Sequence, residues 1–443
     1  MRIKITDRTR DIIARDRKVM LTTTREHYPF VSHKAEGDYT YDIEGNRFID
    51  FATFISVYNF GENASKLVRD AIRSQVGNLM HAAFTDYYSE LPVVFAENLV
   101  KMFPKGFGRV FFSNSGAEAN EAAIKFSKIF TKRQYMMGFY NGFHGRTLGS
   151  LSLTASKNVQ REHFGPFNAV VHAPYAYCYR CPFNQEYPSC GMACVDYIKK
   201  YPLAKEVPPS EVAAIFVEPV AGEGGYIVPP KEFIQGIREI ASDNGILMVS
   251  DEVQAGYMRT GTFLAMDHFK VEADIYTMAK AVGAGLPMGV TVTRSSLGNI
   301  PSGSHANTFG GNLAAVAGAD AQLGYVRKNY GELQAAAYRK GKRMMKRLKQ
   351  MMEDYEIVGD VRGLGMMIGV ELVKDKRSKE PAVEEQEKVL EQCFSNGLLL
   401  LPCGTSSIRL IPPLTISDAN LETGLNLFED AIKSANRNRK RAR

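Results

Sequence analysis

The sequence predicts an α/β protein built around a mostly parallel sheet, and two observations carry that prediction. Between about residue 60 and residue 320, short apolar runs alternate with stretches of helical pattern. The apolar runs contain few polar residues, as is typical of strands buried on both faces of a parallel sheet. The expected strands are 109–113, 135–140, 212–217, 246–250, 275–278 and 289–293, and the clearest helices are 118–132 and 231–244.

The two ends of the chain differ from this central region. Two alternating runs, 39–42 and 47–51, flank a Gly45-Asn46 turn and predict a β-hairpin. The last third begins with a long helical pattern from 313 to 354. Short strands are then expected at 365–372, 398–401 and 407–411, and a helix at 384–395.

The length of 443 residues is too great for one ordinary core, since a domain averages roughly 150 residues. We expect a large domain over 61–325 and a smaller α+β domain made from both termini, 1–60 and 326–443. A long helix is expected to cross the boundary near residue 325, because the helical pattern continues through it.

The composition is that of a soluble globular protein, with 45% hydrophobic and 23% charged residues. No run of about 18 apolar residues predicts a membrane span. The charged start, 1–17, lacks the apolar core of a signal peptide, so a cytoplasmic protein without a membrane partner is expected. The net charge of +7 is modest, and the basic end, 437–443, is predicted to be a solvated, frayed end and not a nucleic-acid contact.

Four of the six cysteines lie close together in the sequence. Cys178, Cys181, Cys190 and Cys194 form the pattern C-x2-C, eight residues, C-x3-C. Four thiolates at such spacings can hold zinc. The connecting loop is shorter than in common zinc ribbons, so reduced thiols and local disulfides remain alternatives. No metal is expected in the main site.

Two polar residues end apolar runs of the predicted sheet. Lys280 follows the run 273–279 and precedes a glycine-rich turn, where a desolvated amine could form an imine. Asp251 follows the run 246–250, where a carboxylate could keep a pyridine nitrogen protonated. Taken singly, Lys280 has the ordinary interpretation of a solvated strand-end lysine, and Asp251 that of a helix N-cap.

A turn of small residues, Ser113 to Ala117, joins a predicted strand to a predicted helix. Backbone amides of Gly116 and Ala117 could converge there on an anion at the helix N-terminus, and Ser115 could add a hydroxyl donor. The order along the chain is phosphate loop, acid, lysine. Together these features describe a complete site for pyridoxal 5'-phosphate (PLP).

Seven sites along the chain, including those just described, carry a family resemblance. They are Ser-Gly-Ala-Glu-Ala-Asn-Glu-Ala at 115–122, Phe-His-Gly-Arg-Thr at 143–147, Glu-Pro-Val-Ala-Gly-Glu-Gly-Gly at 218–225, Asp-Glu-Val-Gln at 251–254, Lys280, Thr-Phe-Gly-Gly-Asn at 308–312, and Ile-Arg-Leu-Ile-Pro-Pro at 408–413. Over nearly its whole length the chain resembles the class III aminotransferases of PLP fold type I, most closely the 4-aminobutyrate, ornithine and acetylornithine branch, with some likeness to archaeal members. The resemblance implies a seven-stranded, mostly parallel sheet flanked by helices in the large PLP-binding domain.

The resemblance also implies roles for the cofactor residues. Lys280 would hold PLP as a Schiff base and then carry a proton, and Asp251 would face the pyridine nitrogen. The remaining expected contacts are Phe143 and Val253 on the two ring faces, Gln254 at the ring hydroxyl, Ser115, Gly116 and Ala117 at the phosphate, His144 and Glu218 beside the ring, and Thr308 at the phosphate of the neighbouring subunit's cofactor. The Thr308 role requires a homodimer or a dimer of dimers, and a symmetric dimer is the default.

Four substrate residues are implied in the same way. Arg409 would bind an α-carboxylate through a bidentate pair, and Glu223 would cover Arg409 when the substrate has no carboxylate there. Arg146 would meet a second, distal carboxylate. Ile55 would shape the pocket entrance, and isoleucine there argues against ornithine. The alternative for each charged residue is a structural ion pair.

The chain departs from the family pattern in three places. Thr53 and Phe54 replace residues that are mostly glycine in relatives, and Ala221 replaces a common glutamine. Residues 61–65 read Gly-Glu-Asn-Ala-Ser where relatives usually have Gly-His-x-His-Pro. Thr53 and Phe54 could narrow the pocket, so the substrate is less certain than the cofactor.

The predicted function is PLP-dependent transamination of an ω-amino acid such as 4-aminobutyrate, with 2-oxoglutarate as acceptor. Ornithine or acetylornithine transamination is one alternative. Another is an amino-acid racemase on the same scaffold, since some archaeal relatives share a segment like 398–404, Leu-Leu-Leu-Leu-Pro-Cys-Gly. Those racemases tend to carry aspartate in place of Glu223, which favours transamination. A non-catalytic binding protein would be expected to have lost Lys280 or Asp251.

Overall fold

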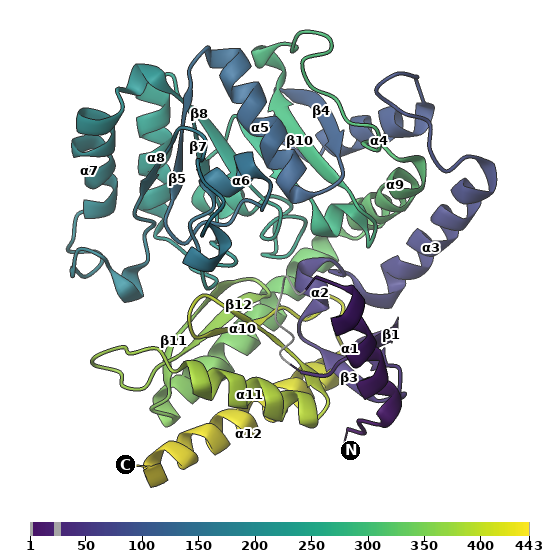
Figure 1. Ribbon diagram of the computed structural model, residues 1–443, viewed down its shortest axis with the longest axis vertical. Coiled ribbons are helices and arrows are strands. Elements are labelled where there is room, and N and C mark those ends of the chain that lie inside the picture. The colour runs from purple at the N-terminus through teal and green to yellow at the C-terminus, as the bar shows by residue number, and fades with distance from the viewer. Residues whose placement is uncertain (1–2, 22–27, 443) are drawn as a thin grey trace. The chain divides into compact units, whose positions relative to one another are not determined.

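The computed structural model describes residues 3–21 and 28–442 and divides the chain into two compact units. Ala64–Gln334 forms the large unit, and Met1–Asn63 together with Ala335–Arg443 forms the small unit. The boundaries expected from the sequence, 60/61 and 325/326, both lie before the boundaries between these units, 63/64 and 334/335. The second boundary falls inside helix α10 (Tyr330–Asp354), so a helix does cross it (Figure 1).

The large unit contains a seven-stranded sheet in the order β4-β10-β9-β8-β7-β5-β6. Its strands are β4 (Phe107–Ser113), β5 (Tyr135–Phe139), β6 (Val170–Ala173), β7 (Val212–Val217), β8 (Leu247–Asp251), β9 (Ile275–Met278) and β10 (Gly289–Arg294). The strands β6, β5, β7, β8 and β9 run parallel, whereas β10 is antiparallel to both of its neighbours. All six residues of β7 are buried, as expected for a central strand covered on both faces. The predicted seven-stranded, mostly parallel sheet is confirmed.

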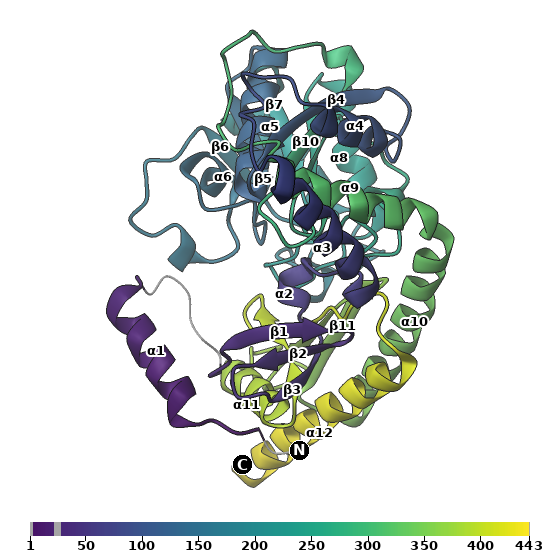
Figure 2. The ribbon, with the colours of Figure 1, turned by 90° about the vertical axis from the view of Figure 1, so that its right-hand side faces the viewer.

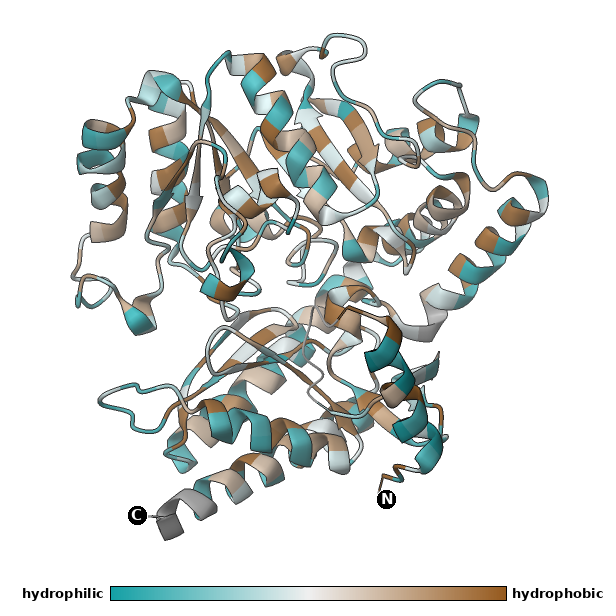
Figure 3. Ribbon diagram, viewed as in Figure 1, coloured by the Kyte–Doolittle hydropathy of each residue, from teal (hydrophilic) through white to brown (hydrophobic). Residues whose placement is uncertain are grey.

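Several helices of the large unit pack against strands of this sheet. The unit contains α3 (Gly61–Asn78), which begins just before the unit boundary, α4 (Glu90–Val100), α5 (Gly116–Thr131), α6 (Leu148–Leu153), α7 (Ala193–Lys200), α8 (Lys231–Asp243) and α9 (Leu313–Lys328). Among them, α4, α5, α6, α7 and α8 make these contacts with the strands. In α8, Phe233, Ile237 and Ile240 are buried at helical spacing, and the Phe233 ring packs 5.5 Å from that of Phe139 in β5. Figure 3 shows hydrophilic and hydrophobic residues alternating along α5 and α8.

The small unit contains two four-stranded sheets. Their orders are β1-β2-β3-β13 and β11-β12-β15-β14, with β1 (Ser32–Glu36), β2 (Tyr39–Asp42), β3 (Arg47–Asp50), β11 (Val358–Leu364), β12 (Met367–Leu372), β13 (Leu398–Leu399), β14 (Leu401–Cys403) and β15 (Ser407–Leu410). The predicted hairpin is β2 and β3, which pair antiparallel. Strand β13 pairs parallel with β3, so the first sheet joins the two ends of the chain.

The helices of the small unit are α1 (Asp7–Val19), α2 (Thr53–Ser56), α10, α11 (Val383–Ser395) and α12 (Asp418–Ala442). Figure 2 shows α11 beside the strands β1, β2 and β3. The contact is apolar: the rings of Phe48 in β3 and Phe394 in α11 stack at 5.0 Å, next to Leu399.

Two expectations about helices are wrong. The single helix expected over 313–354 is two helices, α9 and α10, because Asn329 ends α9 and its carbonyl oxygen then accepts the Leu333 amide at the start of α10. The frayed end expected at 437–443 is helical as far as Ala442, because α12 continues there. No helix within 3–21 or 28–442 is long and apolar enough to cross a membrane.

The segment Thr53–Ser56 is a single turn with left-handed backbone angles. The φ values are +43°, +49°, +64° and +64° at Thr53, Phe54, Ile55 and Ser56. Such angles cost an L residue about 1–2 kcal/mol each, and they are least suited to β-branched side chains. The turn persists because Asp50 Oδ1 accepts the amides of residues 52 and 53 at 2.8 Å, and Thr53 Oγ1 donates to the Ile411 carbonyl at 3.0 Å.

Candidate active site

Asp251 lies at the centre of a buried hydrogen-bond network in the large unit. It is the last residue of β8 and is 4% exposed. Its Oδ2 accepts from Asn120 Nδ2 at 2.8 Å and lies 2.8 Å from His144 Nδ1, while its Oδ1 accepts from the Val253 amide at 3.0 Å. Asn120 is held in turn, because Thr277 Oγ1 donates to its Oδ1 at 2.8 Å. These contacts fix one carboxylate at the carboxyl end of a parallel strand, where α/β sheets bind ligands.

Two further groups set the charge around Asp251. Burial alone would lower the pKa of His144, but the hydrogen bond and charge of Asp251, together with the charge of Glu218, raise it above its ordinary value. Burial raises the pKa of Glu218 to about 7, and the charge of Asp251 adds to the rise, while His144 and two backbone amides oppose it. Asp251 therefore favours a proton on the imidazole, and burial favours the neutral form of Glu218.

The predicted phosphate loop joins β4 to α5. Ser115 is the N-cap of α5, and its Oγ accepts the Glu118 amide at 3.1 Å. The first amides of a helix have no partner within the helix, so those of Gly116 and Ala117 can donate to an anion at this end. The Ser115 hydroxyl keeps its proton and can still act as the expected donor.

The phosphate loop, the acid and the lysine lie at one edge of the sheet. A Cβ placed on Gly116 would lie 2.9 Å from Val253 Cγ1 and 3.5 Å from Ala279 Cβ. Val253 lies two residues after Asp251, and Ala279 precedes Lys280. The strands that lead to Asp251 and Lys280, β8 and β9, are parallel neighbours. Glycine at position 116 therefore keeps open the space where loop, acid strand and lysine strand meet.

Lys280 begins a short 3-10 turn, Lys280–Gly283, directly after β9 and Ala279. Its φ is +48°, a left-handed value that L residues rarely adopt and that clusters at functional sites. Gln322 Nε2 of α9 donates to the Ala281 carbonyl and so holds the turn. The lysine expected at a strand end is thus on a strained, well-anchored turn.

Phe143, Gln254 and Arg146 lie around Glu218 and the loop that follows it. Glu218 Oε1 accepts the Phe143 amide at 2.8 Å, and its Oε2 accepts the Gly222 amide at 2.9 Å. A Cβ on Gly222 would lie 2.6 Å from Gln254 Nε2, so this loop also lies against Gln254. Arg146 is exposed, with its guanidinium 5.9 Å from the centroid of the Phe143 ring. Glu218 thus positions the ring-stacking candidate and the ring-hydroxyl candidate together.

Glu223 forms an ion pair, the alternative considered for it above, with a partner that the sequence did not indicate. Its Oε1 lies 2.9 Å from Lys157 Nζ, and the two side chains are 22% and 37% exposed. A partly exposed pair of this kind is worth at most about 1 kcal/mol, so it can exchange partners when a charged ligand arrives.

The other substrate candidates belong to the small unit. Arg409 lies in β15, is 4% exposed, and donates from Nε and Nη2 to the Pro402 carbonyl at 3.0 and 2.6 Å. Ile55 lies in the left-handed turn and is 38% exposed. Each is described within its own unit.

Thr308 is exposed in the large unit and adjoins a residue tied to the phosphate loop. Asn307 Nδ2 donates to the Phe112 carbonyl at 2.9 Å, and Asn114 Nδ2 lies 3.4 Å from Asn307 Oδ1. The backbone at Thr308 is therefore anchored beside the loop of its own chain while its side chain faces outward.

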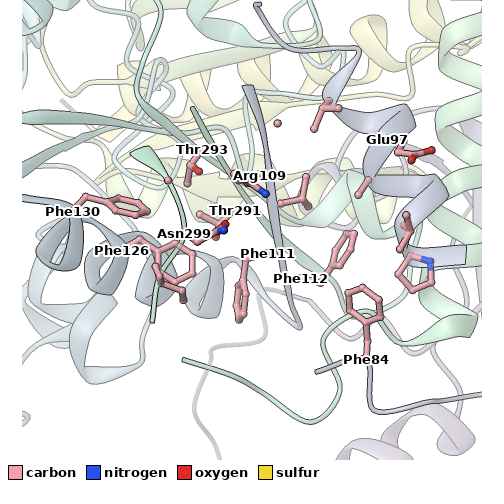
Figure 4. A pocket seen from close by; sticks show the side chains of 18 residues that line it. Phe84, Glu97, Arg109, Phe111, Phe112, Phe126, Phe130, Thr291, Thr293 and Asn299 are labelled. Carbon is pink, nitrogen blue, oxygen red and sulfur yellow. The ribbon is translucent and has the colours of Figure 1, made fainter. Parts of the chain in front are cut away.

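The large unit also contains a cavity that is separate from the candidate cofactor residues. It has a volume of about 420 Å³ and is lined by α4, by residues 108–112 of β4, by Thr291 and Thr293 of β10 and by the second half of α5. Figure 4 shows Phe84, Phe111, Phe112, Phe126 and Phe130 around it. Neither Asp251 nor Lys280 nor any residue of the loop 113–117 is among its lining residues, so this aromatic cavity is distinct from the cofactor candidates.

These features define a transferase of the PLP type, and comparison with known proteins agrees. The model of the class III aminotransferase family matches residues 21–432, and the chain belongs to this PLP-dependent family. An amine transaminase from an uncultivated Pseudomonas species, solved in its PLP-bound form, has a TM-score of 0.86 at 29% identity, covering 94% of this chain and 98% of that one.

Relatives of known name include two kinds of enzyme. A leucine/methionine racemase from Thermococcus litoralis is 38% identical over 427 residues, with 96% of each chain covered. A probable 4-aminobutyrate aminotransferase from Bacillus subtilis is 34% identical over 406 residues, covering 90% of this chain and 92% of the relative. The family is therefore certain, whereas its members differ in reaction.

The arrangement of residues fits bound PLP. The first amides of α5 offer donors for a phosphate beside Val253 and Ala279, and a buried carboxylate ends the strand next to the one that leads to the lysine-bearing turn. Bound PLP supplies an electron sink conjugated with the substrate amine. Asp251 would hold the ring nitrogen in its protonated form, and Asn120 and His144 would hold Asp251.

Several of these residues were not predicted individually. Asn120 belongs to the motif at 115–122, but the sequence assigns it no role. Thr277 is expected only as a residue of the strand 275–278. Lys157 had no signal, because it is 66 positions from Glu223. A polar residue on the buried face of a helix or strand was the one available hint for Asn120 and Thr277.

Proposed function

We propose that this protein transfers the amino group of an ω-amino acid, such as 4-aminobutyrate, to 2-oxoglutarate. The observation that carries this proposal is Glu223, a carboxylate paired with Lys157 on the loop that also supports Gln254. An acid at this position can cover Arg409 when the donor has no α-carboxylate and can release it when glutamate binds. Lys157 gives the released acid an alternative partner.

The roles of the other residues follow from their chemistry. Lys280 Nζ would bind the cofactor and carry the proton that leaves the substrate carbon. Arg409 would take the α-carboxylate of glutamate through its planar guanidinium, and Arg146 would meet the distal carboxylate. Ile55 would bound the space left for the substrate chain. Phe143 and Val253 would pack on the two faces of the cofactor ring, and His144 and Glu218 would act as positioning residues.

A single-turnover experiment tests the reaction. Purified holoenzyme is mixed with L-glutamate alone, and the absorption of the lysine-bound cofactor is followed while 2-oxoglutarate is assayed. We expect conversion to the aminated cofactor with stoichiometric 2-oxoglutarate, and the reverse on adding 2-oxoglutarate. Absence of 2-oxoglutarate from glutamate and of the ω-aldehyde from 4-aminobutyrate would rule out this transamination. Lys280→Ala is the control and should lack the lysine-bound band.

Racemisation is the second candidate, and the 38% identity to the leucine/methionine racemase favours it. The test is loss of optical activity from L-leucine or L-methionine with no keto acid present. A racemase returns the proton to the same carbon, so it yields the opposite enantiomer without 2-oxoglutarate. Glu223→Asp would then be informative, because the racemases that this chain resembles tend to have aspartate there.

We also propose a dimer with shared sites, in which Thr308 contacts the phosphate in the neighbouring subunit. Light scattering should give twice the chain mass or a multiple of it. Mixed dimers of Lys280→Ala and Thr308→Ala chains should regain activity in one of the two sites if Thr308 acts across the interface. Mixtures with no more activity than their parents would contradict the shared site.

A further inference from the structure

The loop between β6 and α7 encloses a small cavity that has no part in the proposed reaction. Its volume is about 20 Å³, room for one water-sized particle. Cys178, Cys181, Cys190 and Cys194 all line it, together with aromatic residues such as Tyr175 and Phe183. The sequence pattern therefore becomes a spatial cluster of four sulfur atoms around one space.

Two tight turns bring the cysteines to this cavity. Cys178 begins a 3-10 turn, Cys178–Arg180, and Cys181 ends it. On the other side, the Cys190 carbonyl accepts the Ala193 amide at 3.2 Å, and Cys194 lies in the first turn of α7. Each turn contributes one pair, so both ends of the loop bring cysteines to the same cavity.

All four cysteines are free thiols, and their exposure is graded. Cys178 is exposed, Cys181 and Cys190 are partly buried, and Cys194 is buried. Burial raises the pKa of the Cys194 thiol to about 11, and the charges of Cys178 and Cys190 contribute to the rise. Burial likewise raises the pKa of Cys178, with Cys190 and Cys181 adding to it. Burial and the neighbouring thiols thus disfavour ionisation of Cys178 and Cys194.

We propose that these four cysteines bind one Zn²⁺ ion in a closed, structural site. Four thiolates satisfy tetrahedral zinc with bonds of about 2.3 Å and leave no position for a substrate. The cavity wall contains no carboxylate or imidazole, the ligands that other divalent ions prefer. Binding releases the four thiol protons to solvent and leaves a net charge of −2 on the site, and Arg180 lies between the first two cysteines in the sequence.

The thiols surround the cavity without already meeting at its centre. Among the described residues, no three Cys, His, Asp or Glu side chains are close enough as placed to hold a metal ion together. The sulfur atoms therefore have to turn inward as the ion binds. All four residues line the same cavity, so the site requires their side chains to converge on that space.

One wall residue connects the cluster to the cofactor residues. Tyr175 is 2% exposed, and its hydroxyl donates to the Glu218 carbonyl at 2.8 Å. Its ring packs 5.2 Å from Phe233 of α8. An ion that orders the loop would therefore also steady Glu218, which holds the Phe143 and Gly222 amides.

Metal analysis of the full-length protein, purified without chelator under reducing conditions, tests this site. We expect close to one zinc per chain, and Co²⁺ exchange should give the intense near-ultraviolet bands of cobalt–thiolate bonds. Cys178→Ser, the most exposed of the four, should lower the zinc content below about half an equivalent. Removing zinc with a chelator should lower the melting temperature of the native protein. Adding zinc back should restore the original melting temperature.

The matched controls are Cys393→Ser and Cys403→Ser, which change buried cysteines of the small unit and should leave the zinc content unchanged. Less than about half an equivalent in native protein and after incubation with Zn²⁺ would overturn the site. A Cys178–Cys181 or Cys190–Cys194 disulfide found by mass spectrometry in metal-free native protein would overturn it as well. Neither result depends on the transaminase assay.

Discussion

The acid network of the large unit and the left-handed turn of the small unit are both strained or costly, but they are stabilised differently. Asp251 is 4% exposed and is held by Asn120, His144 and a backbone amide. The turn presents Phe54 and Ile55 at 40% and 38% exposure, above an anchor made by Asp50 and Thr53. The first feature is fixed by buried polar groups and the second by its base alone. The carboxylate is thus constrained on every side by partners, whereas Phe54 and Ile55 project from a turn that is held only at its base.

The largest effect is expected from removing the charge at the centre of the network. Asp251→Asn should lower turnover at least about 100-fold, because a neutral amide cannot hold the ring nitrogen protonated. Steady-state kinetics of the PLP-loaded variant measure it. Asp267→Asn, in the same unit, is the control and should retain normal turnover. An Asp251→Asn enzyme with turnover near that of wild type would break the comparison.

A pH effect is expected at the neighbouring acid. Burial raises the pKa of Glu252 to about 8, although its carboxylate accepts the amides of Ala265 and Met266. The folded pKa lies above the unfolded value, so this contribution to stability is complete below the unfolded pKa and is lost as pH rises towards 8. Between about pH 5 and pH 8 the free energy of unfolding should fall by up to about 1.4 kcal/mol per pH unit from this group.

Urea unfolding over this pH range measures the effect. Glu252→Gln should flatten the dependence, whereas Glu272→Gln, at a more exposed carboxyl, should not. Equal slopes for wild type and Glu252→Gln would show that Glu252 does not hold its proton when folded.

The left-handed turn can be tested by one pair of substitutions. Phe54→Gly should be more stable than Phe54→Ala by about 1 kcal/mol, because glycine adopts a φ of +49° without a steric penalty. The same pair at Leu67, an exposed position of α3, should show the opposite order, since alanine is favoured in a right-handed helix. Thermal unfolding gives both differences. Alanine equal to glycine at position 54 would mean that the turn is not left-handed in solution.

The smallest effect is expected at the unpredicted ion pair. Lys157→Met should change the free energy of unfolding by less than about 1 kcal/mol, because the pair with Glu223 is partly exposed. Its effect should instead appear in the KM for L-glutamate, with PLP affinity unchanged. Lys200→Met, which removes an exposed pair with Asp196, is the control. A loss of PLP affinity in Lys157→Met would place Lys157 with the interior network.

The sequence was most informative where burial is continuous. The strands over 212–217 and 275–278 were predicted to the residue. An uninterrupted apolar run in a parallel sheet defines both ends of the buried strand. Strand β6 was missed, since four residues that include His172 give little pattern. The break at Asn329 was missed because the helical periodicity continues on both sides of it.

The site was predictable in its strand-end residues and less so in their supports. Lys280 and Asp251 stand out because a charge ends an apolar run. Asn120 and Lys157 depend on contacts made across 131 and 66 positions, which spacing along the chain cannot show. The turn at Thr53–Ser56 was unpredictable for another reason. Threonine, phenylalanine and isoleucine favour extended backbone, and tertiary hydrogen bonds override that preference here.

The pairing of β3 with β13 has a consequence for how the protein is made. Residues 47–50 leave the ribosome early, but their parallel partner, Leu398–Leu399, is synthesised almost 350 residues later. The large unit is one continuous segment, Ala64–Gln334, and can fold as soon as it emerges. The edge of β3 that pairs with β13 therefore stays unpaired through most of translation. Truncated nascent chains should therefore expose an unpaired strand edge near their N-terminal end. Chaperones should bind most strongly there until the last tenth of the chain is complete.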